Sequence, residues 1–174
     1  YYFPETKTPK VITVISEMDY NSKVIYADSL VIISLELYLG KDHKFYQFPN
    51  YLKQNFEQKH ILPDVVESFS IQKIAPLTDT SLLSQMVYYG KQLYLKDLLL
   101  PEYTDADKIG YTLDQNKWCE ENEGYMWRYL LENEMLYSDD PKLGNRFINP
   151  APFSKFYLEI DNESPGRVGT WIGW

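Results

Sequence analysis

Three glycines near the C-terminal end constrain the fold more than any other feature of the sequence. Gly166, Gly169 and Gly173 recur at helical spacing, and the dipeptide Ser164-Pro165 comes just before them. Serine is favoured as a helix N-cap and proline at the first helical position, whereas glycine is a poor helix former. We therefore expect a helix that begins at Ser164, with its glycine face directly against another backbone.

The two ends of the sequence indicate a fragment. The glycine pattern stops at Trp174 without a C-cap, and the sequence opens at Tyr1 instead of a methionine. A length of 174 residues suits one domain. We therefore expect residues 1–174 to form a single domain of a longer protein, truncated at both ends.

Composition argues against some classes of function. The net charge is −8, from 17 basic and 25 acidic residues, and no basic stripe is visible, so no nucleic-acid binding is expected. The single cysteine, Cys119, allows no internal disulfide, and no apolar run is long enough to span a membrane. The 16 tyrosines indicate either recognition surfaces or many half-buried boundary positions. At such positions the ring packs against the protein while its hydroxyl stays in contact with water.

Strand patterns come first in the sequence and helical patterns follow. Residues 11–18 and 30–39 are expected to be strands that pair antiparallel, joined by an extended connection able to add a short strand. Periodicity and capping residues predict helices at about 49–57, 63–74, 81–99 and 112–136, with 138–157 irregular. This order indicates an α+β fold, mainly helical, with a small antiparallel sheet packed on several helices.

The usual motifs of catalysis and metal binding are missing from the sequence. His43 and His60 lie 17 positions apart in expected loops, so they do not form the His-Glu-x-x-His zinc motif. Cys119 follows Trp118 in a predicted helix, which is typical of a core thiol, and neither a Gly-x-Ser-x-Gly motif nor a phosphate loop is present. We expect neither a metal nor a cofactor.

Three carboxylates are the one candidate for acid–base chemistry. Glu159, Asp161 and Glu163 alternate along an extended stretch, so they could share a face and act as a hydrolase of peptides or cell-wall glycans. A structural role is the preferred alternative, because an acid near the helix start is stabilised by the helix dipole. Arg167 opposes that dipole, and we expect it to pair with Asp161 or Glu163.

A recognition surface is expected on the long apolar helix at 81–99. Lys91 lies on this helix near Tyr88 and Tyr94, where it either extends to water or finds a partner in a groove. Trp127, from the aromatic side of the following long helix, is a further candidate. These four residues form the candidate binding groove.

Several longer stretches together resemble a known family. They are residues 37–43, 86–94 (MVYYGKQLY), 109–112, 118–124, 136–138 and 163–174 (ESPGRVGTWIGW). In this order they resemble the gliding-motility lipoprotein family of the GldB type, over nearly the whole sequence. The terminal stretch is the most specific of them.

The resemblance implies a lipid-anchored protein of the bacterial cell envelope that faces the periplasm. It implies a role in gliding and the associated secretion, through other proteins of that machinery, and no enzymatic activity carries over from it. Asp161, Glu163, Arg167 and Trp171 are then expected to dock the terminal helix against helix 81–99. A purely structural lipoprotein is left open as an alternative.

A more distant similarity is to zinc peptidases of the zincin type. The order of elements is alike, and an alignment places residues 90–94 where those enzymes carry His-Glu-x-x-His. Gly90 and Tyr94 then replace the zinc ligands and Lys91 replaces the catalytic glutamate, so nothing is left to hold zinc or activate water. The similarity implies a pseudo-peptidase, a zincin-like scaffold that keeps a groove without the metal ligands.

Overall fold

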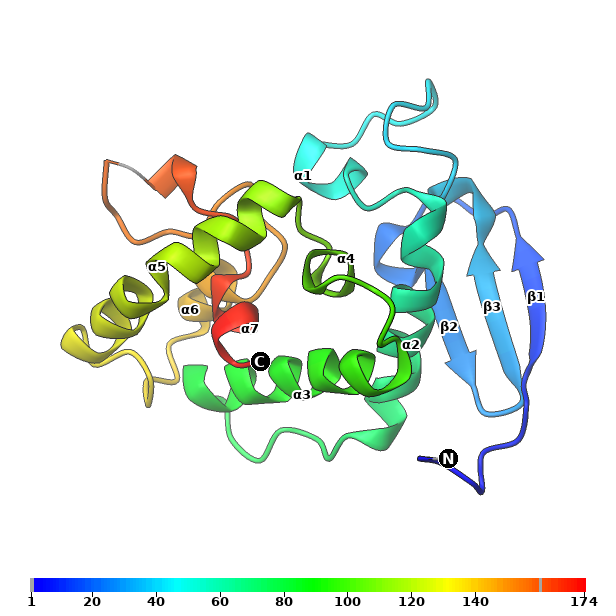
Figure 1. The fold of residues 1–174 in the computed structure, drawn as a ribbon, viewed down its shortest axis with the longest axis horizontal. Helices are drawn as coiled ribbons and strands as arrows, with labels where there is room; N and C mark the ends of the chain where they lie inside the picture. Colours follow the sequence, from blue (N-terminus) through cyan, green and yellow to red (C-terminus); the bar gives the residue numbers. More distant parts are fainter. Residues whose placement is uncertain (1, 160) are drawn as a thin grey trace.

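The computed structural model describes residues 2–159 and 161–174, with a small sheet at one end and helices over the rest (Figure 1). The strands are β1 (Lys10–Val14), β2 (Val24–Ala27) and β3 (Leu30–Ser34). The helices are α1 (Asn50–Lys53), α2 (Ile61–Lys73), α3 (Leu82–Leu99), α4 (Asp105–Ile109), α5 (Leu113–Glu132), α6 (Pro141–Phe147) and α7 (Val168–Ile172). Short 3₁₀ turns lie at Tyr20–Ser22, Leu35–Leu37, Gln58–His60 and Asp161–Glu163. The mainly helical α+β class is confirmed.

The sheet is mixed, so the predicted antiparallel pairing of its first and last strands is wrong. β3 lies in the centre, antiparallel to β2 and parallel to β1, and Val31 stands opposite both Val11 and Tyr26. The reason is that the connection forms β2, which reverses into β3 through a tight turn where Asp28 has a φ of 46°. Two reversals restore the direction of β1, so β1 and β3 run the same way.

One face of the sheet packs on α2 and forms the first core. Tyr26, Val31 and Ile33 are buried there against Val66 and Phe69 of α2. The rings of Tyr26 and Phe69 meet edge to face, with centroids 5.1 Å apart. The sheet is thereby fixed to α2, the helix whose other residues reach the middle of the molecule.

Helix α3 runs beneath both halves of the molecule and contributes to two cores (Figure 1). Near its C-terminal end, Leu95 is buried in the sheet core. Near its N-terminal end, Leu82 and Met86 are buried in a second core formed with α5, α6 and α7. Successive stretches of one predicted apolar helix therefore serve both halves.

Several predicted element boundaries are shifted by local hydrogen bonding. The capping box that opens α5 is present, with Thr112 and Gln115 each bonded to the backbone of the other. This helix ends at Glu132, four residues before the expected limit, because Glu134 takes a left-handed φ of 51°. Within the segment expected to be irregular, Asp140 and the following proline start α6 as N-cap and first helical residue.

The terminal helix begins later than predicted but packs as expected. Arg167 takes a left-handed φ of 64°, so α7 starts at Val168 and Ser164 is not its N-cap. A Cβ placed on Gly90 would lie 1.8 Å from the carbonyl oxygen of Gly173, which leaves no room for any substituent there. The three predicted glycines do lie against backbone: a Cβ on Gly173 would meet the Met86 carbonyl oxygen of α3 at 2.0 Å, one on Gly169 the Phe147 carbonyl oxygen of α6 at 2.9 Å, and one on Gly166 the Ala151 carbonyl oxygen at 2.2 Å. The close backbone contact is therefore confirmed, but it involves three segments, and of these glycines Gly173 is the one that faces α3.

Candidate functional site

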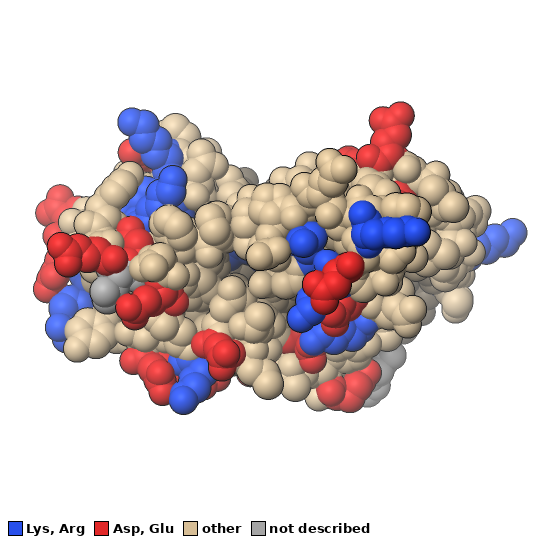
Figure 2. All heavy atoms as spheres, turned by 90° about the horizontal axis from the view of Figure 1, so that it is seen from above, with Lys and Arg blue, Asp and Glu red and all other residues tan. Residues whose placement is uncertain are grey.

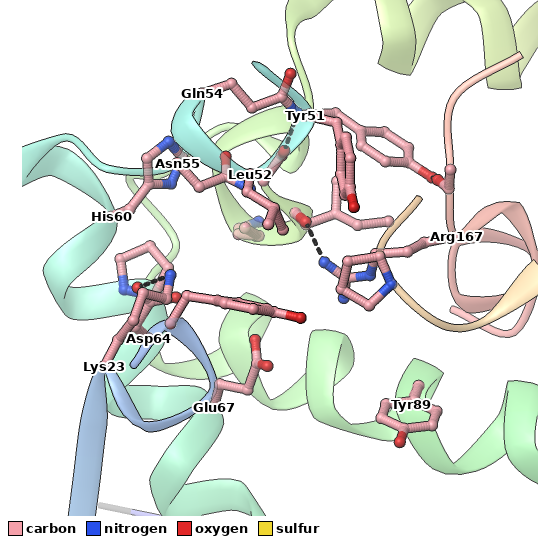
Figure 3. Close-up of a pocket in the computed structure, with 18 of the residues that line it drawn as sticks. Lys23, Tyr51, Leu52, Gln54, Asn55, His60, Asp64, Glu67, Tyr89 and Arg167 are labelled. Atoms are coloured by element: carbon pink, nitrogen blue, oxygen red, sulfur yellow. Dashed lines mark hydrogen bonds and ion pairs between the residues drawn. The ribbon is translucent and has the colours of Figure 1, made fainter. Parts of the chain in front are cut away.

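A cleft of about 300 Å³ lies between the sheet half and the helical half. Its lining comes from α1, α2, α3, α4 and the segment just before α7, which are far apart in sequence (Figure 3). Seen from above, the molecule narrows between two lobes that carry acidic and basic side chains in mixture (Figure 2). The volume is at the small end of the range for ligand sites in proteins.

Helix α2 supplies two carboxylates to the cleft on one helical face. Asp64 and Glu67 are three positions apart, so they lie one above the other on the helix. Asp64 accepts a hydrogen bond from the Lys23 ammonium group at 2.5 Å and another from the Tyr38 hydroxyl at 2.7 Å. Glu67 accepts from the Lys96 ammonium group at 2.7 Å. Both acids are thus held by partners from other elements.

Glu67 is the acid whose ionisation the cleft changes most clearly. Burial raises the pKa of its carboxyl, but the charges of Lys96 and then Arg167 outweigh burial and lower the pKa to about 2. Lys96 has a side chain only 3% exposed and also donates to the Lys108 carbonyl oxygen at 2.9 Å. At neutral pH the cleft floor therefore holds an ionised, hydrogen-bonded pair.

Further ion pairs tie α4 to its neighbours at the edge of the cleft. Lys108 lies between Asp97 at 2.7 Å and Asp105 at 3.2 Å. Although burial lowers the pKa of Lys108, its hydrogen bonds to these acids raise the pKa overall. Lys59 contacts Asp107 at 2.6 Å. The acids of α4 thus serve to position this helix.

Arg167 reaches into the cleft from the start of α7 (Figure 3). One guanidinium nitrogen, Nη1, donates to the Ile109 carbonyl oxygen at 3.1 Å. The predicted pairing of Arg167 with Asp161 or Glu163 is wrong, because within residues 2–159 and 161–174 Arg167 has no ion pair. The left-handed conformation of Arg167 turns its side chain toward α4 instead.

Asp161 has a structural role in the loop before α7. Its carboxylate accepts hydrogen bonds from the backbone N–H groups of Phe156, Tyr157 and Leu158, between 2.8 and 3.2 Å. Glu159 and Glu163 are exposed, and neither lines the cleft. The three carboxylates therefore do not converge on a common cavity, and the arrangement expected of a glycosidase-like pair is not formed.

Trp171 joins α7 to α5. Its indole N–H donates to the Asn116 side-chain oxygen at 3.3 Å, and its ring packs against the helical core. The C-terminal residue is held to α3 by another indole, since Trp174 donates to Asp97 at 2.7 Å. Of the predicted docking residues, Trp171 thus contacts the helical core while Glu163 points to solvent.

The four residues of the candidate binding groove are not brought together around the cleft. Lys91 and Tyr94 are exposed on α3, and Tyr94 keeps 59% of its surface in solvent. Tyr88 packs edge to face on Tyr89 with centroids 5.3 Å apart, and Trp127 packs against the helical core. None of the four lines the cleft, so a binding role for this surface stays a prediction.

A second cavity, of about 290 Å³, lies between α5 and the loop before α7. Its walls are mainly apolar and include Trp118, Met126 and Phe156, together with the Asp161 loop. Trp127 does not line this cavity either. The cavity therefore offers mainly an apolar contact surface and few groups suited to catalysis.

The single cysteine and one of the two histidines are withdrawn from solvent. Cys119 is fully buried, and burial is the main cause that raises the pKa of its thiol to about 12. His60 is 4% exposed, and burial lowers the pKa of its imidazole, which is therefore neutral at pH 7. In the described part of the protein, no three His, Cys, Asp or Glu residues are grouped so that they could hold a metal ion.

The cleft residues of α2 had a sequence signal that motifs do not capture. His60 is the N-cap residue of α2, and Asp64 and Glu67 follow it at spacings of four and three, which places the three on one helical face beside a buried apolar face. A polar stripe of this kind usually faces solvent. The sequence pattern could not reveal that α4 and Arg167 lie opposite this stripe across the cleft.

The fold and its charged cleft define a mainly helical α+β domain with a polar cleft between two cores. No helix within the described residues combines the length and apolar character needed to cross a bilayer. The whole sequence, residues 1–174, matches the family described as gliding motility protein GldB. The protein therefore belongs to this family of gliding-motility lipoproteins, which associates it with the cell envelope and confirms the resemblance seen in the sequence.

No curated protein and no solved structure matches the sequence. The distant similarity to zincin peptidases is thus supported by no comparison and stays a prediction.

Proposed function

We propose that this domain is a non-catalytic part of a periplasm-facing lipoprotein and supports gliding and the associated secretion by binding protein partners. Membership of the GldB family supplies the gliding role. The binding, non-catalytic part of the proposal rests on one observation about the cleft. The acids that line it are all engaged in ion pairs that position helices. A site of this kind presents fixed polar groups to a partner, and binding is the function that it serves best.

Position 90 supports the pseudo-peptidase part of the proposal. In the zincin alignment Gly90 stands where a zinc ligand would be, and a Cβ there would lie 1.8 Å from the carbonyl oxygen of Gly173, which caps the C-terminal end of α7. A histidine at this position is incompatible with α7 in its place. Lys91, aligned with the catalytic glutamate, is exposed and lies outside the cleft.

The binding role can be tested by gliding assays on the full-length lipoprotein in its own bacterium. Tyr51→Ala and Tyr89→Ala truncate two aromatic walls of the cleft, and Tyr137→Ala is a matched control because Tyr137 is 83% exposed elsewhere. We expect reduced spreading from the cleft variants at normal protein levels, and normal spreading from the control. Lys91→Ala with Tyr94→Ala tests the exposed surface of α3 in the same assay.

Two results would contradict the proposal. Normal gliding from both the cleft variants and the α3 variants, with each protein accumulating normally, would remove the protein-binding role. Hydrolysis of peptides or glycans by the purified domain, abolished by Glu67→Gln while the fold is retained, would show that the cleft is catalytic.

A further inference from the structure

Arg167 is a cation in the cleft without an anion of its own. Its guanidinium group makes one hydrogen bond, from Nη1 to the Ile109 carbonyl oxygen, and no ion pair with any described residue. A guanidinium group has five N–H donors in a planar fork, which suits a carboxylate in a two-point contact. Most of the donors of Arg167 are therefore available to a ligand.

The backbone of Arg167 is held in a conformation that arginine rarely adopts. Its φ of 64° and ψ of 24° lie in the left-handed region, which disfavours residues with a Cβ. The residue before it is fixed, because Tyr111 donates a hydrogen bond to the Gly166 carbonyl oxygen at 2.6 Å. Unusual backbone conformations of this kind gather at binding and catalytic sites, where they aim a side chain.

The charges around Arg167 leave room for one negative charge. Lys96 and Glu67 form an ion pair beneath it, and Arg167 is close enough to Glu67 to lower the pKa of that acid. Lys23 is likewise paired with Asp64, at 2.5 Å. Lys108 at the cleft edge is paired with Asp97 and Asp105, so among the described residues Arg167 is the one cation lining the cleft that has no carboxylate within ion-pair distance. A single carboxylate would balance it, whereas a doubly charged phosphate would meet repulsion from Glu67.

Tyrosine hydroxyls provide further donors beside the guanidinium group. Tyr51 of α1 points toward the same part of the cleft as Arg167 (Figure 3), and its hydroxyl has no hydrogen-bond partner among the described residues. Tyr89 of α3 forms part of the wall, and burial is the main cause that raises the pKa of its hydroxyl. The Tyr89 hydroxyl is therefore protonated at neutral pH, and both hydroxyls are hydrogen-bond donors.

We propose that the cleft binds one carboxylate group of a partner protein, from either an acidic residue or a free C-terminus. Arg167 is the anchoring cation, Tyr51 is a second donor, and Glu67 excludes ligands with two negative charges. This inference rests on the proposed binding function and names the chemistry of the partner. A protein segment is the occupant that fits, because the cleft is open to solvent and has tyrosine walls for flanking residues.

The test is an NMR titration of the 174-residue protein with four probes. Three are acetylated alanine pentapeptides: one with a central glutamate and an amidated end, one with glutamine in its place, and one without acidic residues but with a free C-terminus. The fourth is inorganic phosphate. We expect the glutamate peptide, the free-terminus peptide or both to shift the amide signals of Ile109 and Gly110, and the glutamine peptide and phosphate to leave them unchanged.

Variants locate the contact. Arg167→Gln should weaken binding of the responding peptide by about tenfold or more, since a hydrogen-bonded charge pair is lost. Tyr51→Phe keeps the ring and should weaken binding by roughly threefold, the loss of one neutral hydrogen bond. Arg128→Gln is the matched control, because it removes one positive charge from the exposed side of α5 and should change nothing. Thermal unfolding of each variant checks that it is folded.

Several outcomes overturn the proposal. They are no response to either carboxylate peptide, an equal response to the glutamine peptide, a stronger response to phosphate, or an equal loss from Arg128→Gln. If Arg167→Gln proves unfolded, unchanged binding by Tyr51→Phe overturns the assigned geometry. If binding fails while the cleft variants still impair gliding, the carboxylate inference is wrong and the binding function stands.

Discussion

The contact between α3 and α7 gives the sharpest prediction about stability. Replacing Gly90 with alanine would place a Cβ 1.8 Å from the carbonyl oxygen of Gly173, and the obstructing atoms belong to the backbone. Real Cβ contacts do not fall below 3.0 Å, so the two helices would have to separate by at least about 1.2 Å. A gap of that size forfeits at least about half of the dispersion attraction across the contact.

The expected change in the free energy of unfolding combines two opposing effects, overpacking and helix propensity. Overpacking of a well-packed contact typically costs about 1–3 kcal/mol, and backbone atoms cannot relax as side chains do. Alanine regains up to about 1 kcal/mol through its better helix propensity. Because the overlap at Gly90 is severe, we expect Gly90→Ala to lower the free energy of unfolding by about 2 kcal/mol. The sign is opposite to that of an ordinary glycine-to-alanine change in a helix.

Urea unfolding followed by circular dichroism measures this free energy, and α5 supplies a matched control. Gly124 lies in the exposed middle of α5, where an added Cβ meets nothing within 4 Å. Gly124→Ala should therefore raise the free energy of unfolding by about 0.5–1 kcal/mol. If Gly90→Ala is as stable as the wild type or more stable, the close approach of α3 and α7 is refuted.

Two further predictions concern ionisable groups. The pKa of Glu67 falls to about 2 in the folded state, below its ordinary value of 4.5, so its contribution to stability is complete above pH 4.5 and is lost as the pH falls toward 2. Denaturant unfolding between about pH 2.5 and 6 should therefore show a steeper loss of stability in the wild type than in Glu67→Gln, and equal slopes would contradict the assignment. Burial raises the pKa of Cys119 to about 12, so an aromatic disulfide reagent at about pH 8 should modify Cys119 only after denaturant is added. Rapid modification of the native protein would show that this thiol is accessible.

Local sequence signals predicted the long helices because each carries its own start and its own apolar face. The capping box of Thr112 and Gln115 is of this kind, since both partners lie within one turn. The sheet was harder, because the direction of β1 depends on whether the connection folds into β2. The start of α7 was misplaced because Arg167 takes a left-handed conformation that its residue type disfavours.

The cleft could not be predicted, for a different physical reason. Tyr51, Glu67, Tyr89 and Arg167 come from four parts of the fold, and what brings them together is long-range packing that no periodicity records. Sequence reasoning placed the recognition surface on α3 through Lys91, which is exposed. It also assigned Arg167 to nearby acids, whereas the structure points its guanidinium group at the carbonyl of Ile109.

The position of α3 beneath both cores has a consequence for how the molecule opens. Leu82 and Leu95 lie on one continuous helix but are buried in different cores, so unfolding of that helix removes packing from both cores at once. The sheet half and the helical half should therefore unfold as one cooperative unit, and the amides in the middle of α3 should exchange with solvent only through global unfolding. The cleft lies between two halves that share this helix, so its shape is as durable as the fold itself.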